Sequence, residues 1–84
     1  MARKILKKKI YQYTAIFEQD KEFGGFTVSI PALQGCISEG DTFEDALENI
    51  QEAAILYLDV MKEENKKIPF YDQGVIIAPI RVAA

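Results

Sequence analysis

The chain has 84 residues, of which 49% are hydrophobic and 27% charged, and its net charge is −3. This composition is typical of one small globular domain and excludes a disordered tail. There is no histidine and only one cysteine, Cys36, which excludes an intrachain disulfide, any catalytic pair that uses histidine, and the usual zinc sites.

The chain begins with a cluster of basic residues. Five of the ten basic residues fall within the first nine positions: Arg3, Lys4, Lys7, Lys8 and Lys9. From Ile10 onward, five basic residues stand against thirteen acidic ones, so that part carries a net charge of −8. An acidic body attracts a basic partner rather than phosphates. We interpret residues 1–8 as a frayed basic arm, with a nucleic-acid-binding arm as the alternative.

The start of the chain also bears on its location. No apolar run of signal-peptide length follows the basic residues, and the longest apolar runs, Ala53–Leu58 and Val75–Ile80, are far shorter than the roughly 20 residues that cross a bilayer. A single cysteine fits a reducing compartment. We therefore expect a cytoplasmic protein with no membrane segment.

Three strands are predicted in the first half of the chain. Lys9–Gln19 alternates and is rich in β-branched and aromatic residues. Asp20–Gly25 predicts a turn, because its glycines supply positive φ. Phe26–Pro31 alternates again and ends at a proline, which has no N–H for a ladder. Cys36–Gly40 predicts a short third strand, so the three form an antiparallel meander.

The second half predicts a helix and a last strand. Thr42 is a suitable N-cap, and Asp45 three residues later gives a capping-box pattern. We place the helix over Phe43–Asn65. Its apolar stripe comprises Phe43, Leu47, Ile50, Ala54, Tyr57 and Met61. Val75–Val82 is almost continuously apolar, which predicts a strand covered on both faces, and Pro79 places it at an edge or a bulge.

The predicted order is β-β-β-α-β, an α+β two-layer sandwich. A helical crossover lets the final strand run parallel to strand one. The helix is also apolar beyond its stripe, at Ile55, Leu56 and Leu58. One covering helix on one sheet does not need these three residues, so we assign them to a homodimer or other partner interface.

Candidate chemistry is sparse. Cys36 has no positive charge beside it and is best interpreted as a small apolar strand residue. Glu48 and Glu52 share a helix face that could hold Mg²⁺, but an exposed solubilising face explains them better. The middles of the predicted strands carry no carboxylate, so we expect no catalytic, metal or cofactor residues. A degenerate nuclease that uses Glu48, Glu52 or Asp41 is a further hypothesis.

The stretch "GGFTVSIPALQGCISEGDTFEDAL" resembles the HicB-like antitoxin family, of UPF0150 type. The family pattern is a glycine turn, an alternating strand that ends in P-x-L-x-G-C, and a G-D-T-x-x-E/D-A helix start. The residues that carry it are Gly24, Gly25, Pro31, Leu33, Gly35, Cys36, Gly40, Asp41, Thr42, Asp45 and Ala46. The resemblance runs from about Ile10 to Val82.

The resemblance implies a partial RNase H-like fold that lacks the catalytic acids. It also implies a non-enzymatic antitoxin, which binds and neutralises a HicA-type toxin, a small basic RNA-cleaving protein with a double-stranded-RNA-binding-like fold. Many members add a C-terminal DNA-binding module; we expect residues 1–84 to form a single HicB-like domain without one. The alternative is an orphan domain that binds nucleic acid through the basic arm.

Charge alone suggests which surface would face such a toxin. Four acidic residues are predicted at the corner between strand three and the helix: Glu39, Asp41, Glu44 and Asp45. We expect this corner to bind the partner, since complementary charge steers association.

Overall fold

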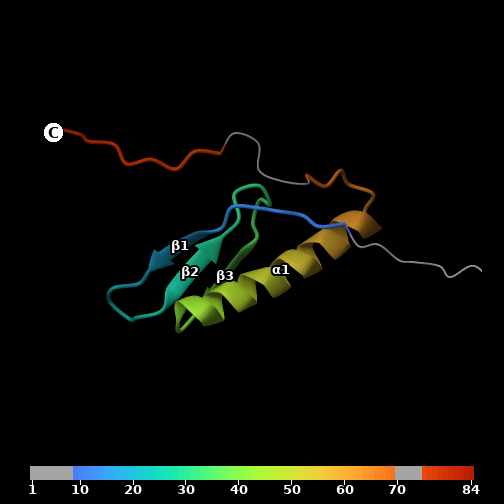
Figure 1. The fold of residues 1–84 in the computed structure, drawn as a ribbon, viewed down its shortest axis with the longest axis horizontal. Coiled ribbons are helices and arrows are strands. Elements are labelled where there is room, and N and C mark those ends of the chain that lie inside the picture. The colour runs from blue at the N-terminus through green and yellow to red at the C-terminus, as the bar shows by residue number, and fades with distance from the viewer. Residues whose placement is uncertain (1–8, 70–74) are drawn as a thin grey trace, which may run out of the picture.

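The computed structural model describes residues 9–69 and 75–84. Its elements are β1 (Ile16–Gln19), β2 (Phe26–Ser29), β3 (Ile37–Gly40) and α1 (Phe43–Glu63). The strands form one sheet in the order β1-β2-β3, and both pairs are antiparallel. Helix α1 lies along one face of the sheet and packs mainly against β3 and next against β2 (Figure 1). The predicted meander, the helix and the α+β class are confirmed.

Strand β1 is shorter than predicted. The sequence pattern extends from Lys9, but β1 begins at Ile16, which pairs with Ser29 at the end of β2. Pro31 follows two residues later and cannot donate to a ladder. Residues before Ile16 therefore lie beyond the reach of β2, and their alternation alone does not make them part of this sheet.

The first turn depends on its glycines. The Asp20 N–H donates to the Gly25 carbonyl at 3.0 Å, and the Gly24 N–H donates to the Asp20 carbonyl at 2.9 Å. Gly24 and Gly25 both have φ of +79°, which other residues rarely adopt. A Cβ on Gly25 would also lie 2.8 Å from the Gly40 carbonyl oxygen of β3. The predicted glycine turn is confirmed.

The segment between β2 and β3 is a compact loop whose apolar side chains enter the core. The Ile30 N–H donates to the Cys36 carbonyl at 3.1 Å, and the Cys36 N–H donates to the Leu33 carbonyl at 2.9 Å. Leu33 and Cys36 are buried. Gly35 has φ of +84° and turns the chain between them. The residues of this loop therefore act as scaffold.

Helix α1 begins where the sequence predicts. The Thr42 hydroxyl accepts from the Asp45 N–H at 3.0 Å, which satisfies one of the first N–H groups of the helix. The helix ends at Glu63, two residues before the predicted end, and Asn65 adopts φ of +56°.

The buried face of α1 is rotated from the predicted stripe. Ala46 and Ile50 are buried, whereas Phe43 and Leu47 stay exposed. Ala53, Ala54, Tyr57 and Leu58 pack at the margin of the core. Because α1 packs against β3 and β2, the side chains on its flank toward β1 are less buried than the predicted stripe required.

The structure does not confirm the predicted last strand. Residues 75–84 have no strand or helix structure, all are exposed, and none packs against the core. They run apart from the sheet (Figure 1). The prediction of a strand covered on both faces over Val75–Val82 is not confirmed, because strand propensity becomes a strand only where a neighbouring strand supplies hydrogen bonds.

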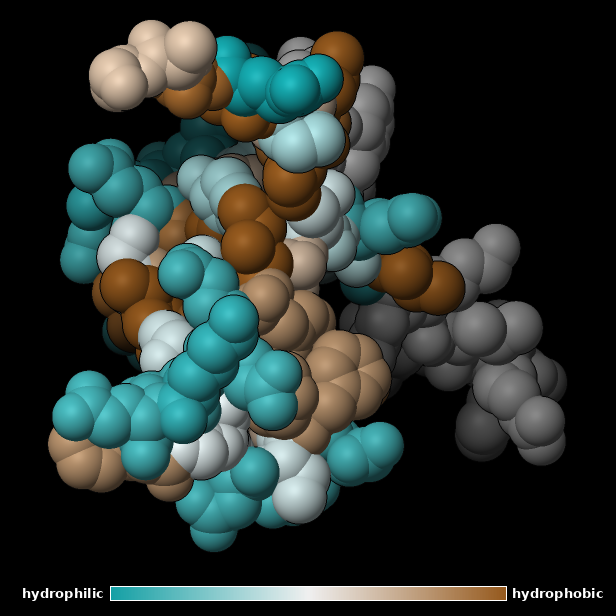
Figure 2. Space-filling model, turned by 90° about the vertical axis from the view of Figure 1, so that its left-hand side faces the viewer, coloured by the Kyte–Doolittle hydropathy of each residue, from teal (hydrophilic) through white to brown (hydrophobic). Residues whose placement is uncertain are grey.

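The core is small, and apolar surface remains outside it. Among the described residues, six are buried: Val28, Ile30, Leu33, Cys36, Ala46 and Ile50. Hydrophobic side chains remain in view among hydrophilic ones in Figure 2. Three short strands and one helix cannot cover all the apolar side chains of so small a domain. Within the described residues, no helix combines the length and the apolar character that a membrane span requires.

Candidate partner-binding surface

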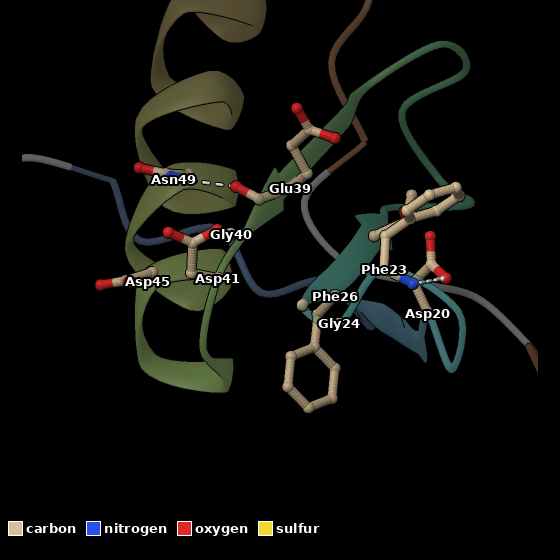
Figure 3. Close-up of a pocket in the computed structure, with 11 residues that line it drawn as sticks. Asp20, Phe23, Gly24, Phe26, Glu39, Gly40, Asp41, Asp45 and Asn49 are labelled. Carbon is tan, nitrogen blue, oxygen red and sulfur yellow. Dashed lines mark hydrogen bonds between the residues drawn. The ribbon is translucent and has the colours of Figure 1, made fainter.

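A hollow lies where the first turn, the end of β3 and the start of α1 meet. Its volume is about 570 Å³. Four carboxylates line it, together with two aromatic side chains and an amide: Asp20, Glu39, Asp41, Asp45, Phe23, Phe26 and Asn49. Figure 3 shows that they come from the first turn, β2, the end of β3 with the bend after it, and the first half of α1. None of the described residues that line it is basic.

Close backbone packing fixes the helix side of the hollow. A Cβ on Gly40 would lie 2.3 Å from the Ala46 nitrogen, so β3 approaches α1 as closely as only glycine permits. The Asn49 side-chain amide donates to the Glu39 carbonyl at 2.7 Å and ties the helix to the strand (Figure 3). The carboxylates here are thus held on rigid elements.

The turn side of the hollow is organised by Asp20. Its Oδ1 accepts from the Glu22 N–H at 2.9 Å and from the Phe23 N–H at 3.0 Å, which is the side-chain turn that aspartate favours. Phe23 is 85% exposed. An aromatic ring that the fold leaves in water beside an acidic hollow is a feature of binding surfaces rather than of cores.

Three of the four predicted site residues line this hollow. Glu39, Asp41 and Asp45 lie along it, while Glu44 is exposed on the first turn of α1 and does not line it. Sequence reasoning missed Asp20, Phe23 and Asn49. The meander itself carries the missing signal, since Phe26 pairs with both Gln19 and Gly40 and so brings the first turn beside the helix start.

The chemistry that the hollow offers is negative charge. Among residues 9–69 and 75–84, no three cysteine, aspartate or glutamate side chains are placed to hold a metal ion. Glu48 and Glu52 are exposed on α1 and do not line the hollow. Burial raises the pKa of the Cys36 thiol, so this side chain is held in the form that is not nucleophilic. The hollow is thus suited to cationic side chains.

The three predicted interface residues do not share one face. Ile55 and Leu58 line a groove on the β1 side of α1, and Leu58 also packs at the core margin. Leu56 lines a separate hollow on the β3 side, with Ile37 and Val60. The three residues thus lie on two flanks of α1, because positions 55 and 56 differ by about 100° around a helix.

The basic arm is only partly described. Arg3, Lys4, Lys7 and Lys8 lie outside the described residues, and Lys9 is exposed. The aromatic residues that follow lie beside the end of α1: the Lys62 ammonium is 5.9 Å from the centre of the Tyr11 ring, and the Tyr13 hydroxyl donates to the Pro69 carbonyl.

The described residues thus form a small α+β domain with an acidic hollow. Comparison with known proteins identifies the family of this domain. Residues 13–76 match the model of the HicB-like antitoxin of bacterial toxin-antitoxin systems. Since this match covers more than half of the sequence, the chain belongs to the HicB-like antitoxin family, as its resemblance predicted.

Individual relatives agree with this family. A UPF0150 protein of Synechocystis sp. is 38% identical over 78 residues, which cover 93% of this chain and 95% of the relative. A UPF0150 protein of Thermoplasma acidophilum is 43% identical over 58 residues, or 69% and 83% of the two chains. Antitoxin HicB 1 of Photorhabdus laumondii is 34% identical over 85 residues, which cover 98% of this chain and 53% of the relative.

Proposed function

We propose that this protein is an antitoxin module that binds and neutralises a small basic toxin of the HicA type. The observation that carries the proposal is the acidic hollow between the first turn and α1, with Phe23 exposed at its margin. Family membership and the similarity to Antitoxin HicB 1 support it. The proposal includes a non-catalytic role, because binding alone neutralises such a toxin.

The physical basis is charge complementarity. A toxin that cleaves RNA must present cationic side chains to phosphates, and the same side chains suit the hollow formed by Asp20, Glu39 and Asp41. Phe23 would supply apolar contact area beside the charged contacts. The antitoxin would thereby occupy the surface that the toxin needs for RNA.

Several finer features belong to the same proposal. We infer that the domain completes a partial RNase H-like sheet in which the last strand runs parallel to β1, and that the protein works in the cytoplasm as one domain. We retain Ile55, Leu56 and Leu58 as self-association residues, now on two flanks of α1.

Charge reversal within the hollow tests the binding surface. Glu39→Lys changes an exposed side chain whose residue contributes only its carbonyl to the Asn49 hydrogen bond. We expect it to weaken toxin binding by about tenfold or more, as measured by isothermal titration calorimetry with the purified basic toxin. Glu48→Lys is the matched control, since it makes the same charge change on the exposed part of α1 and should leave the affinity nearly unchanged.

Two further measurements decide whether the binding proposal fails. Thermal unfolding should show that both variants keep the wild-type fold. Equal affinity for the wild type and Glu39→Lys would show that the toxin does not bind at this hollow, and the proposal in its present form would be wrong.

The alternative is nucleic-acid binding through Arg3, Lys4, Lys7, Lys8 and Lys9, which the charge cluster alone favours. This function predicts an affinity for RNA or DNA that falls steeply with salt and disappears when the five residues are changed to glutamine. Binding that survives these substitutions, or no binding at low salt, would end this alternative.

A further inference from the structure

A second hollow lies on the flank of α1 that faces β3, and we call it the β3-side hollow. Its volume is about 410 Å³, and its lining is largely apolar. Three large apolar residues that line it, Ile37, Leu56 and Val60, are between 50% and 66% exposed. Leu56 and Val60 stand one turn apart on the helix and so form one surface. Water is an unfavourable environment for such a surface, which therefore favours a cover.

Carboxylates surround the exposed part of the β3-side hollow. Glu52, Asp59 and Glu63 are exposed, and each lies one helical turn from an apolar residue of the hollow. Lys66 at the rim is paired with Glu64 at 2.9 Å. Helix α1 as a whole carries six acidic residues against one basic residue. The hollow therefore suits a segment that is apolar at its centre and cationic around it.

The same charges count against the β3-side hollow of a second copy as the cover. Two α1 helices that packed together through this flank would bring carboxylates of one copy close to carboxylates of the other. Juxtaposed like charges are unfavourable at an interface. The cover must therefore be a segment of different composition.

The basic arm, together with Lys9, has the required composition. Residues 1–9 read M-A-R-K-I-L-K-K-K and contain no acidic residue. The apolar pair Ile5 and Leu6 stands between two basic residues before it and three lysines after it. An apolar pair between cations is complementary to an apolar hollow between carboxylates.

The described part of the chain begins near this hollow. The Lys62 ammonium is 5.9 Å from the centre of the Tyr11 ring, and the segment that leads into β1 passes beside the end of α1 (Figure 1). Met61, the neighbour of Lys62, lines the β3-side hollow. Five or six extended residues span roughly 17–20 Å, whereas a helix with its side chains is about 10–12 Å across. The apolar pair of the arm can therefore reach the hollow of its own chain.

We propose that the basic arm folds back onto the β3-side hollow of the same chain. Its apolar pair would cover Leu56 and Val60, and its cations would meet the surrounding carboxylates. The arm is then a cover rather than a frayed end, and its docked cations are withheld from nucleic acid. This contact goes beyond the antitoxin function and needs no toxin. It leaves Ile55 and Leu58, rather than Leu56, for self-association.

Nuclear Overhauser contacts in the wild type test whether the arm occupies the hollow. The full chain is labelled on the methyl groups of isoleucine, leucine and valine and is studied at low salt. We expect contacts between the methyl groups of the arm and those of Leu56 and Val60. They should vanish in an isotope-filtered experiment on mixed labelled and unlabelled protein, which detects only contacts between chains. No contacts at all, or contacts only between chains, would overturn the proposal.

Trypsin cleavage after Lys4 tests which flank of α1 holds the arm. A docked arm shields this bond, so Leu56→Lys, which removes apolar contact and repels the arm, should speed cleavage by about tenfold. Ile55→Lys is the matched control, because it makes the same charge change at a similarly exposed residue on the other flank. It should leave the rate unchanged, and circular dichroism should show an intact helix in both variants. Equal cleavage of the wild type and Leu56→Lys would contradict the docked arm.

Discussion

Strand β2 and the segment 75–82 contain similar side chains and have opposite fates. Both are rich in β-branched and large apolar residues, and both contain or precede a proline. Strand β2 lies between β1 and β3 and buries Val28. The segment, by contrast, has no neighbouring strand in the part of the chain that the structure describes, and its side chains stay exposed. The difference shows that composition gives a segment its strand propensity, but that the segment forms a strand only where the edge of another strand is available for pairing.

The largest expected contrast lies between a core residue and a segment residue. Leu33→Ala should lower the free energy of unfolding by about 3 kcal/mol, because it opens a cavity in a small core. Val82→Ala should change the free energy of unfolding by less than about 0.5 kcal/mol in dilute, monomeric protein. Urea unfolding followed by circular dichroism measures both, and equal losses would place the segment inside the cooperative unit of the single chain.

A smaller effect is expected where β3 meets α1. Gly40→Ala should lower the free energy of unfolding by about 2 kcal/mol, since the new Cβ would overlap the backbone of Ala46 and force the helix away from β3. Gly35 has a positive φ, but a Cβ added there would meet open space. Gly35→Ala should therefore lower the free energy of unfolding by only about 1 kcal/mol. If thermal unfolding ranked Gly35→Ala as the more damaging change, the close approach of β3 and α1 would be wrong.

The helix cap gives a third comparison within the body of the domain. Thr42→Ala removes the hydroxyl that accepts from the Asp45 N–H and should cost about 1 kcal/mol. Thr42→Ser keeps a hydroxyl and should recover most of that loss. Chemical denaturation of the two variants makes the comparison, and an undamaged Thr42→Ala would mean that packing against β3, rather than the cap, sets the start of α1.

The smallest effect concerns Cys36. Burial raises the pKa of this thiol, so the folded state disfavours the thiolate. Its contribution to stability is complete below the unfolded thiol's pKa of about 8.5 and decreases as the pH rises above it, because the unfolded chain then ionises first. Urea midpoints at about pH 7 and about pH 9.5 should therefore differ more for the wild type than for Cys36→Ala. Equal differences would show that the thiol is not shielded.

Local signals predicted much of the body. The glycine turn, Pro31 two residues beyond β2 and Thr42 at the start of α1 each act through their own backbone neighbourhood, and the turn and the helix start are found where expected. The failures depend on distant partners. The late start of β1 depends on the length of β2. The exposure of Leu47 and of residues 75–82 depends on which elements pack against them, and the local sequence does not contain that information.

The candidate site was also predicted in part, for the same reason. Glu39, Asp41 and Asp45 are close in sequence, and their cluster could be recognised from charge alone. Asp20 and Phe23 join them only because the meander returns the first turn to the helix start. Glu44 is near in sequence but lies on a part of the first helical turn that does not line the hollow.

Co-purification with a toxin tests the central claim most directly. The protein would be expressed with any small basic protein that is encoded beside its gene, with a tag on one of the two. Growth of cells that express the basic protein would be recorded with and without this protein. The account predicts that the two proteins elute together and that growth is restored by the wild type and by Glu48→Lys, but much less by Glu39→Lys. Separate elution with no restored growth would contradict the antitoxin function.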